Sequence, residues 1–255
     1  MNRTPPLISV ITPAFNAERF IGDTIKSVQA QTYTHWEMII VDDASTDETA
    51  AVVEQFRKDD PRIQLIRLKT NGGPAVARNT AIDQAQGRYF AFLDADDMWL
   101  PEKLEKQLRF MQDNQIAFSF TKYITVHEDG TKTNSVVNIP EQVHYRQLLK
   151  HNVIGCLTVM LDTAMIGPVK MVDMRSRQDF ALWLDLCKRG FTAYGLREVL
   201  AKYRITSHSL SRNKLKMAKQ NWKIYRDVEQ LTFLSSIWYF ANYVYYSLKK
   251  YMRQY

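Results

Sequence analysis

The sequence has few cysteines, glycines and histidines. Its 255 residues include two cysteines, nine glycines and five histidines. Cys156 and Cys187 lie far apart in apolar surroundings, so we expect buried thiols in a reducing compartment, with neither a disulfide framework nor a cysteine-based metal site. The low glycine content excludes collagen-like sequences, and a hydrophobic fraction of 45% excludes disorder.

The N-terminus, MNRTPPLISV, has no apolar core of the length that a secretory signal peptide needs, so we expect a cytoplasmic protein. The chain is long enough for one large core or for a domain with an appendage. Its net charge of +7 suits phosphorylated substrates, an anionic membrane face or nucleic acid. Because the first two hundred residues contain no pattern typical of a nucleic-acid module, we expect no nucleic-acid partner.

Short apolar runs alternate with helical patterns along the first hundred residues. This alternation predicts βαβ units and a parallel sheet flanked by helices. The expected strands are residues 7–12, 37–41, 63–68 and 88–93, followed downstream by helices at 102–114 and 180–189 and strands at 117–126 and 196–205. The stretch between these later elements, up to residue 167, gives no clear pattern.

The expected strand in YFAFLDADDMWL ends in three carboxylates, Asp94, Asp96 and Asp97. Open α/β sheets bind their ligands beyond the carboxyl ends of the strands. Crowded carboxylates repel one another unless a cation lies among them, and Mg²⁺ or Mn²⁺ prefers oxygen ligands. The alternative interpretation is a solvated acidic loop that precedes the helix at 102–114.

Asp42 and Asp43 follow the second expected strand in the same way, so a parallel sheet would bring both acidic clusters to one edge. Gly72 and Gly73 permit close approach of the backbone to a ligand. Arg78 lies about one helical turn beyond them, either at that site or in a surface ion pair.

Residues 231–248, LTFLSSIWYFANYVYYSL, carry no charge and are rich in aromatics, and Lys249, Lys250 and Arg253 follow them. The polar residues within this stretch make it a poor membrane span. Tyr and Trp favour lipid headgroups, and trailing cations suit anionic lipid, so we expect contact with the inner membrane surface. The alternative is a helical hairpin packed on the domain or on a second subunit in a homo-oligomer.

Five motifs, in order, resemble those of the family 2 glycosyltransferases. They are LISVITPAFNAERFIGDTIKSVQAQTY, EMIIVDDASTDET, NGGPAVARNTAI, GRYFAFLDADD and RQDFALWLDL, and the resemblance runs over residues 7–211. It implies a GT-A fold with a Rossmann-like, mostly parallel sheet over residues 1–211, and residues 212–255 would form a helical C-terminal appendage. Within the family, the chain is most similar to bacterial cell-wall and capsule enzymes, teichuronic acid glycosyltransferases of bacilli among them.

The resemblance implies an inverting, metal-dependent transfer from a UDP-sugar to a lipid-linked glycan acceptor. Asp94-Ala95-Asp96 matches the DXD motif, in which Asp96 would hold Mn²⁺ or Mg²⁺ with Asp94 nearer the ribose. Asp179 matches the catalytic base, but Gln178 replaces the acid that usually precedes it. The matching donor-pocket residues are Pro13, Asn16, Asp42 or Asp43, Gly72, Gly73, Arg78 and Asn79, and Arg204 and His208 match a basic segment that would contact the diphosphate or the metal. His208 has an alternative interpretation as an exposed loop histidine.

Three other functions give different expectations. A nucleotidylyltransferase would have a glycine-rich loop with Lys or Arg after its first strand, where this chain has Pro13-Ala14-Phe15-Asn16. A dinucleotide-dependent oxidoreductase would have G-x-G-x-x-G there. A degenerate, non-catalytic scaffold would not be expected to keep Asp94, Asp96 and Asp179.

Overall fold

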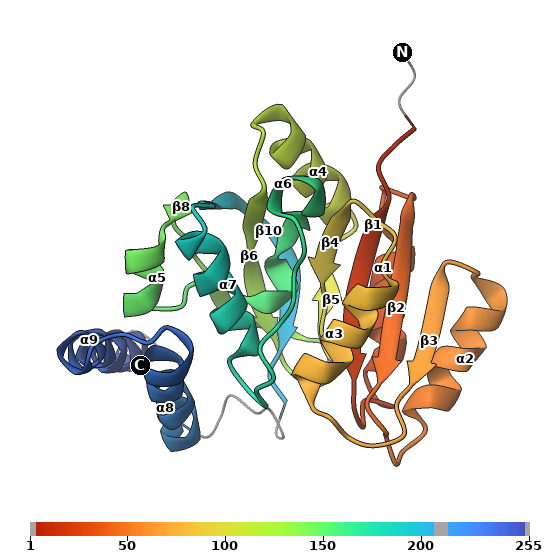
Figure 1. Cartoon of the computed structure of the whole chain (residues 1–255). Coiled ribbons are helices and arrows are strands. Elements are labelled where there is room, and N and C mark those ends of the chain that lie inside the picture. Colours follow the sequence, from red (N-terminus) through yellow and green to blue (C-terminus); the bar gives the residue numbers. More distant parts are fainter. Residues whose placement is uncertain (1–3, 207–213, 253–255) are drawn as a thin grey trace.

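The computed structural model describes residues 4–206 and 214–252. Its centre is one sheet with the strand order β3-β2-β1-β4-β9-β6-β10-β5, while β7 pairs with β6 and β8 with β10 (Figure 1). The strands are β1 (Ile8–Ala14), β2 (Trp36–Asp42), β3 (Ile63–Arg67), β4 (Tyr89–Phe92), β5 (Met98–Trp99), β6 (Phe118–Val126), β7 (Lys132–Val137), β8 (Gln142–Val143), β9 (Met160–Asp162) and β10 (Ala193–Arg204).

Helices cover both faces of this sheet (Figure 1). They are α1 (Ile21–Gln29), α2 (Thr49–Asp59), α3 (Pro74–Gln84), α4 (Lys103–Asp113), α5 (Tyr145–Lys150), α6 (Thr163–Ile166), α7 (Gln178–Lys188), α8 (Lys214–Lys223) and α9 (Phe233–Met252), with a 3₁₀ turn at Cys156–Thr158 and a π-helical turn at Ile224–Val228.

The strands β3, β2, β1, β4, β6 and β10 all run in one direction, which confirms a mostly parallel sheet. The exception inside the sheet is β9, which lies antiparallel between β4 and β6. This strand was not predicted from the sequence, because three residues are too few to show an alternating pattern. The antiparallel β9 leaves the carboxyl ends of β4, β6 and β10 at the same edge.

Both faces of the central strands are buried, as expected for a parallel sheet between helical layers. Successive residues of β1 and β2 alternate between two hydrophobic cores. One core includes Ile11 and Ile39 and is covered by α3 and α7, whereas the other includes Val10 and Met38 and is covered by α1, α2 and α4.

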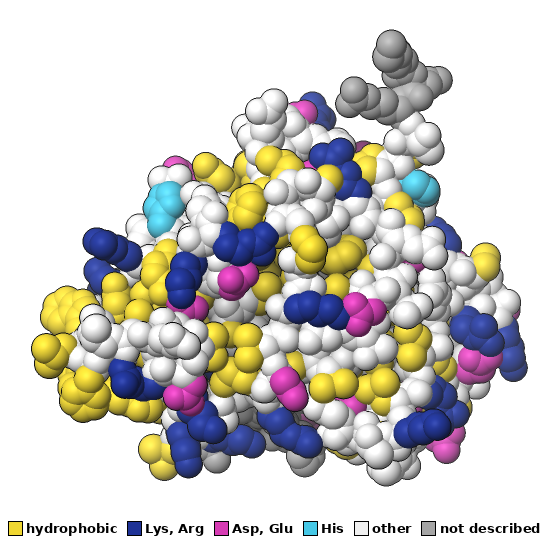
Figure 2. Space-filling view, viewed as in Figure 1, with side chains coloured by type: hydrophobic (Ala, Val, Ile, Leu, Met, Phe, Trp, Pro, Cys, Tyr) yellow, Lys and Arg dark blue, Asp and Glu magenta, His cyan; other side chains and the backbone are white. Residues whose placement is uncertain are grey.

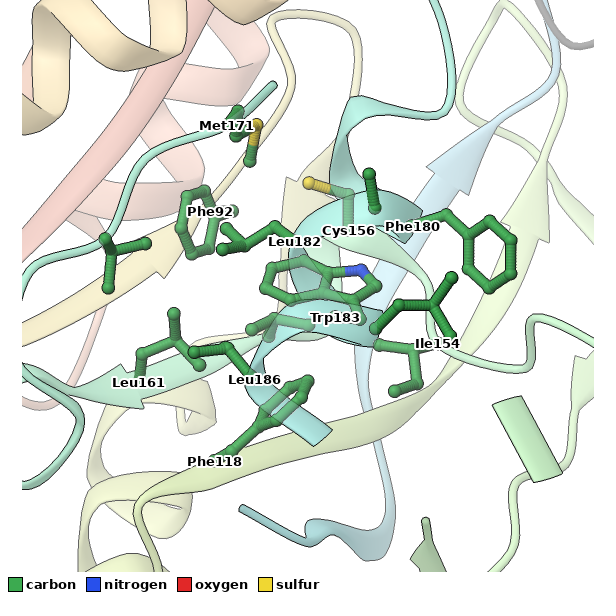
Figure 3. Close-up of a cluster of buried hydrophobic side chains, with 14 of the residues drawn as sticks. Phe92, Phe118, Ile154, Cys156, Leu161, Met171, Phe180, Leu182, Trp183 and Leu186 are labelled. Carbon is green, nitrogen blue, oxygen red and sulfur yellow. The ribbon is translucent and has the colours of Figure 1, made fainter. Parts of the chain in front are cut away.

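Trp183 anchors α7 to the sheet. Its ring is fully buried and packs at 5.5 Å from the Phe92 ring of β4 and at 5.2 Å from the Phe118 ring of β6. Figure 3 shows this indole in the middle of the cluster, between Leu186 and Cys156. The first turn of α7 is thereby carried to the edge where the parallel strands end.

The C-terminal segment packs on this domain along one side. Ile224 and Tyr225 of the π-helical turn are fully buried in the core that contains α7, and the Tyr225 hydroxyl donates to the Leu149 carbonyl at 2.6 Å. The helix α9 follows and contacts α5, where Tyr246 stacks on His151 at 5.3 Å. Within the described ranges, no helix combines the length and apolarity needed to cross a bilayer.

Lys103, at the start of α4, is completely buried, and its Nζ lies 3.8 Å from the centre of the Trp99 ring without a hydrogen-bond partner. Burial lowers the pKa of this amine well below its ordinary value. Because the unfolded chain keeps a pKa of about 10.4, this lowered pKa costs stability wherever the unfolded lysine is charged, and the cost shrinks as the pH rises toward that value.

We therefore expect Lys103→Met to raise the free energy of unfolding at pH 7 by about 1–3 kcal/mol, the cost of an unpartnered buried polar group. Urea unfolding of both proteins at pH 7 and pH 9.5 measures this, and the advantage of the variant should be smaller at the higher pH. The control is Lys106→Met, which changes an exposed lysine paired with Glu102 and Glu198. Equal or lower stability of Lys103→Met at pH 7 would contradict the prediction.

Candidate active site

The two acidic clusters lie at one edge of the sheet, on either side of the end of β1. β1 pairs in parallel with β2, which ends in Asp42, and with β4, which leads into Asp94. The Asp43 amide donates to the Ala14 carbonyl at 2.8 Å, which fixes the loop after β2 beside the end of β1. This is the shared edge that the parallel order predicts.

The turn after β4 brings three carboxylates close together, and they are partly or fully removed from solvent. Asp97 is almost fully buried, and burial, followed by the charges of Asp96 and Asp94, raises its pKa well above the ordinary value. Burial and the charge of Asp94 also raise the pKa of Asp96 to about 6. A divalent cation would relieve this repulsion, so the donor set suits Mg²⁺ or Mn²⁺.

Among the described residues, no group of three or more His, Cys, Asp or Glu side chains is arranged to enclose a metal ion. Mg²⁺ is commonly held by one or two carboxylates together with substrate phosphates, and Asp94 and Asp96 match that simpler arrangement. His208, the third expected ligand, lies outside the described residues.

Arg78 reaches this turn from the first half of α3. Its side chain is buried and forms an ion pair with Asp94, but Nε and Nη1 are buried without any hydrogen-bond partner. Burial would lower its pKa, yet the negative charge of Asp94 and, further, that of Asp179 outweigh it and raise the pKa. Arg78 does form an ion pair, but within the site and not on the surface: its own side chain is buried, Asp94 is 33% exposed, and two of the donors of Arg78 remain for a ligand.

Arg204, at the end of β10, is also buried, and its donors point to protein atoms. Its Nε donates to the Asp96 carbonyl at 2.9 Å, Nη2 to the Asp23 carboxylate at 3.0 Å, and Nη1 to the Glu128 carbonyl. The backbone amide of Arg204 donates to Asp97 Oδ1 at 2.9 Å. This differs from the expected contact with a diphosphate: in this arrangement Arg204 supports the acidic turn from behind.

Asp43 shapes the glycine turn on the other side of the site. Its two carboxylate oxygens accept the backbone amides of Gly72 at 2.8 Å and Gly73 at 2.7 Å. Gly73 has a φ of +88°, which a residue with a side chain rarely adopts, so glycine is needed there. Asp42 is buried as well and accepts the Ser45 amide at 3.2 Å.

Two expected pocket residues hold loops together. The side-chain amide of Asn79 donates to the Met171 carbonyl and accepts the Met171 amide, both at 2.8 Å, so it fixes the segment that leads to α7. Asn16, in the left-handed region, accepts the Thr46 amide at 2.9 Å and links the loops after β1 and β2. Pro13 lies within β1, opposite Val41.

Asp179 lies in the first turn of α7 and is half-buried. Its charge contributes to the raised pKa of Arg78, which brings the expected base and the acidic turn into one electrostatic site. Gln178 before it is buried, and its Oε1 has no hydrogen-bond partner. Asp179 and the acidic turn come from segments about eighty residues apart in the sequence, and only the fold brings them into one site.

Sequence reasoning missed the exposed side chain of Phe15, the residue that directly follows β1. Phe15 is 50% exposed, at the edge where the acidic clusters meet. A large aromatic residue directly after a buried strand is a signal that could have indicated it, since exposed aromatic faces in ligand sites suit stacking on a base.

The profile of glycosyl transferase family 2 matches residues 9–166. The chain belongs to this family. It is 50% identical over 250 residues, 98% of its length and 99% of the relative's, to the candidate teichuronic acid biosynthesis glycosyltransferase TuaG of Bacillus subtilis. It is 38% identical to WfgD of Escherichia coli, a UDP-Glc:alpha-D-GlcNAc-diphosphoundecaprenol beta-1,3-glucosyltransferase, with 98% of this chain and 96% of WfgD covered.

Solved structures show the same fold at lower identity. Staphylococcus aureus TarS, residues 1–349 in complex with UDP, aligns with a TM-score of 0.68 and 21% identity over 86% of this chain and 65% of TarS. The mannosyltransferase PcManGT of Pyrobaculum calidifontis, in complex with GDP-Man and Mn²⁺, aligns with a TM-score of 0.67 and 19% identity over 88% of this chain and 65% of that one. The enzyme is therefore a family 2 glycosyltransferase with a GT-A fold.

Proposed function

We propose that this glycosyltransferase moves a sugar, with inversion, from a UDP-sugar to a hydroxyl group of a lipid-linked cell-wall glycan at the inner membrane surface. The observation that carries the proposal is the ion pair of the buried Arg78 with Asp94 at the carboxyl edge of the parallel strands, where the charge of Asp179 also acts on Arg78. UDP in the complex of TarS supports the donor class, and the lipid-linked acceptor in the name of WfgD supports the acceptor class.

The donor half of the site is the acidic turn with Arg78. A divalent cation held by Asp96 and Asp94 would neutralise charge on the diphosphate. The free Nε and Nη1 of Arg78 are buried donors that suit an anionic or carbonyl group of the nucleotide. Buried donors aimed at the leaving group stabilise the charge that develops on it during transfer.

The acceptor half is the first turn of α7. In a single in-line displacement, the acceptor oxygen bonds to the anomeric carbon while the bond to the diphosphate oxygen breaks, and UDP leaves. The proton of the attacking hydroxyl passes to Asp179, which is half-buried and accessible at the start of the helix. Gln178 cannot act as a second acid, so the proposal assigns the base to Asp179 alone.

Asp179→Asn should reduce the rate of transfer by about 10²–10⁴-fold, the usual contribution of a general base. It should leave UDP affinity nearly unchanged, because the donor half is intact. Calorimetric titration with UDP and release of UDP from a panel of UDP-sugars, beginning with UDP-glucose, measure the two effects. Asp185→Asn, an exposed change on the same helix, is the control. Normal transfer by Asp179→Asn would refute the assignment.

Asp96→Ala should weaken UDP binding in the presence of Mn²⁺ by about tenfold or more and should abolish the difference between Mn²⁺ and EDTA. The reason is that a carboxylate ligand of the cation is lost. The control is Asp113→Ala, in an exposed ion pair at the end of α4. A variant that keeps the full Mn²⁺ dependence would exclude Asp96 as a ligand. Absence of UDP binding by the unaltered protein under both conditions would favour the non-catalytic scaffold.

The membrane part of the proposal is based on the outer face of α9. One side of this helix packs on the domain, and the other exposes large hydrophobic side chains, which Figure 2 shows gathered at the left edge of the molecule. These exposed residues are Phe233, Leu234, Ile237, Trp238, Val244, Tyr245 and Leu248. The neighbouring helix α8 adds Lys216, Lys219 and Lys223, and such a pairing of apolar and basic surface suits anionic lipid.

Leu234→Glu with Trp238→Glu should release the protein from vesicles of anionic phosphatidylglycerol, because both side chains lie on the exposed face of α9. Co-flotation with these vesicles and with neutral phosphatidylcholine vesicles is the measurement. The matched control is Met165→Glu with Val172→Glu, two exposed apolar residues elsewhere on the surface. Unchanged flotation would refute the membrane role. Failure of the unaltered protein to float, together with a dimer that Leu234→Glu dissociates, would identify the face as a subunit interface.

A further inference from the structure

Arg177, directly before α7, has an unusual backbone conformation. Its φ of 66° and ψ of 9° place it in the left-handed region, which costs a residue with a side chain about 1 kcal/mol or more. Such conformations persist where the surroundings determine them, and they cluster at functional sites. Arg177 lies two residues before Asp179, so any contact that fixes it also fixes the start of this helix.

The contact that fixes Arg177 comes from the C-terminal helix. Arg177 Nη2 donates to the Tyr243 hydroxyl of α9 at 3.3 Å, and its guanidinium lies 5.4 Å from the centre of the Tyr243 ring. The same guanidinium lies 5.8 Å from the ring of Phe180, a buried residue of α7. Arg177 is therefore held between α7 and α9 by two aromatic rings.

The C-terminal segment also holds the far end of α7. Glu229, which follows the π-helical turn and is buried, pairs with Lys188 at 3.2 Å and accepts the Tyr145 hydroxyl at 2.6 Å. The segment before α9 and α9 itself thus contact α7 at its last and first turns. Burial makes the Glu229 contacts costly to break.

The opposite side of the segment before α7 is tied to the donor pocket. Arg175 Nη1 donates to Asn71 Oδ1 at 2.9 Å, next to the glycine turn that Asp43 holds. Asn79 fixes Met171 further upstream, as described above. Residues 171–177 therefore run from the wall of the donor pocket to the contact with α9, and the position of Asp179 depends on both ends.

We propose that Arg177 and Tyr243 are positioning residues through which the C-terminal helix sets the placement of Asp179 for transfer. This inference rests on the proposed role of Asp179 as the base. Tyr243 does not touch the substrate; it acts through Arg177 on the first turn of α7. Because α9 also presents the proposed membrane face on its other side, the helix that contacts the membrane is the same helix that positions Asp179.

The test is Tyr243→Ala, with the rate of transfer and UDP affinity measured separately. The kcat should fall by about tenfold to a hundredfold, because small displacements of catalytic groups reduce rates by this much. The Kd for UDP should stay within about twofold. Tyr243→Phe keeps the ring and should recover part of the loss. The matched control is Tyr246→Ala, which removes an equally large ring of α9 that stacks on His151 instead, and its kcat should stay near that of the unaltered enzyme.

A second variant separates positioning from folding. Arg177→Gly removes the guanidinium and suits the left-handed backbone, so thermal stability should hold while kcat falls as in Tyr243→Ala. The double variant Arg177→Gly/Tyr243→Ala should lose no more than either single variant, since both remove one contact.

Three results would overturn the inference: an unchanged kcat in Arg177→Gly, equal losses in Tyr243→Ala and Tyr246→Ala, or additive losses in the double variant. Failure of the proposed function is distinguishable from these results. It would appear as full transfer by Asp179→Asn, whatever the behaviour of Arg177 and Tyr243.

Discussion

The site depends on the charge balance of one buried acidic turn. Three carboxylates follow β4, of which Asp97 is buried and Asp94 and Asp96 are partly exposed, and two buried arginines approach them from separate elements. Arg204 uses its donors on protein atoms behind the turn, whereas Arg78 pairs with Asp94 and keeps two donors free. Arg204 therefore holds one side of the turn in place, whereas the negative charge on the other side is only partly neutralised. A site of this kind can bind a cation together with an anionic ligand.

The helix α7 links this turn to the rest of the molecule. Trp183 fixes it to β4 and β6, Asn79 fixes the segment that precedes it, and Arg177 meets Tyr243 of the C-terminal helix. Each of these contacts involves a different layer of the fold. Consequently the placement of Asp179 reflects the packing of the whole domain, and the C-terminal segment is part of that packing through Ile224 and its neighbours.

Much of the fold was predictable, because strands buried on both faces and the helices between them leave strong periodic signals. The parallel order then predicted that the acids after β2 and β4 would meet. The antiparallel β9 was not predictable, since Met160–Asp162 is too short to show a period. The detailed roles of Asn79 and Arg204 were not predictable either, because a side chain in a motif can face the ligand or the protein, and only its neighbours decide which.

By itself, the sequence determined the fold class, the family and the types of residue at the site, because these follow from local periodicity and from motifs that are contiguous in the chain. The tertiary structure decided which donors remain free, as in Arg78, and which are used internally, as in Arg204. It also decided that Tyr243 reaches Arg177 across sixty-six positions of sequence. Such contacts depend on how helices pack in space, and no pattern along the chain indicates this packing.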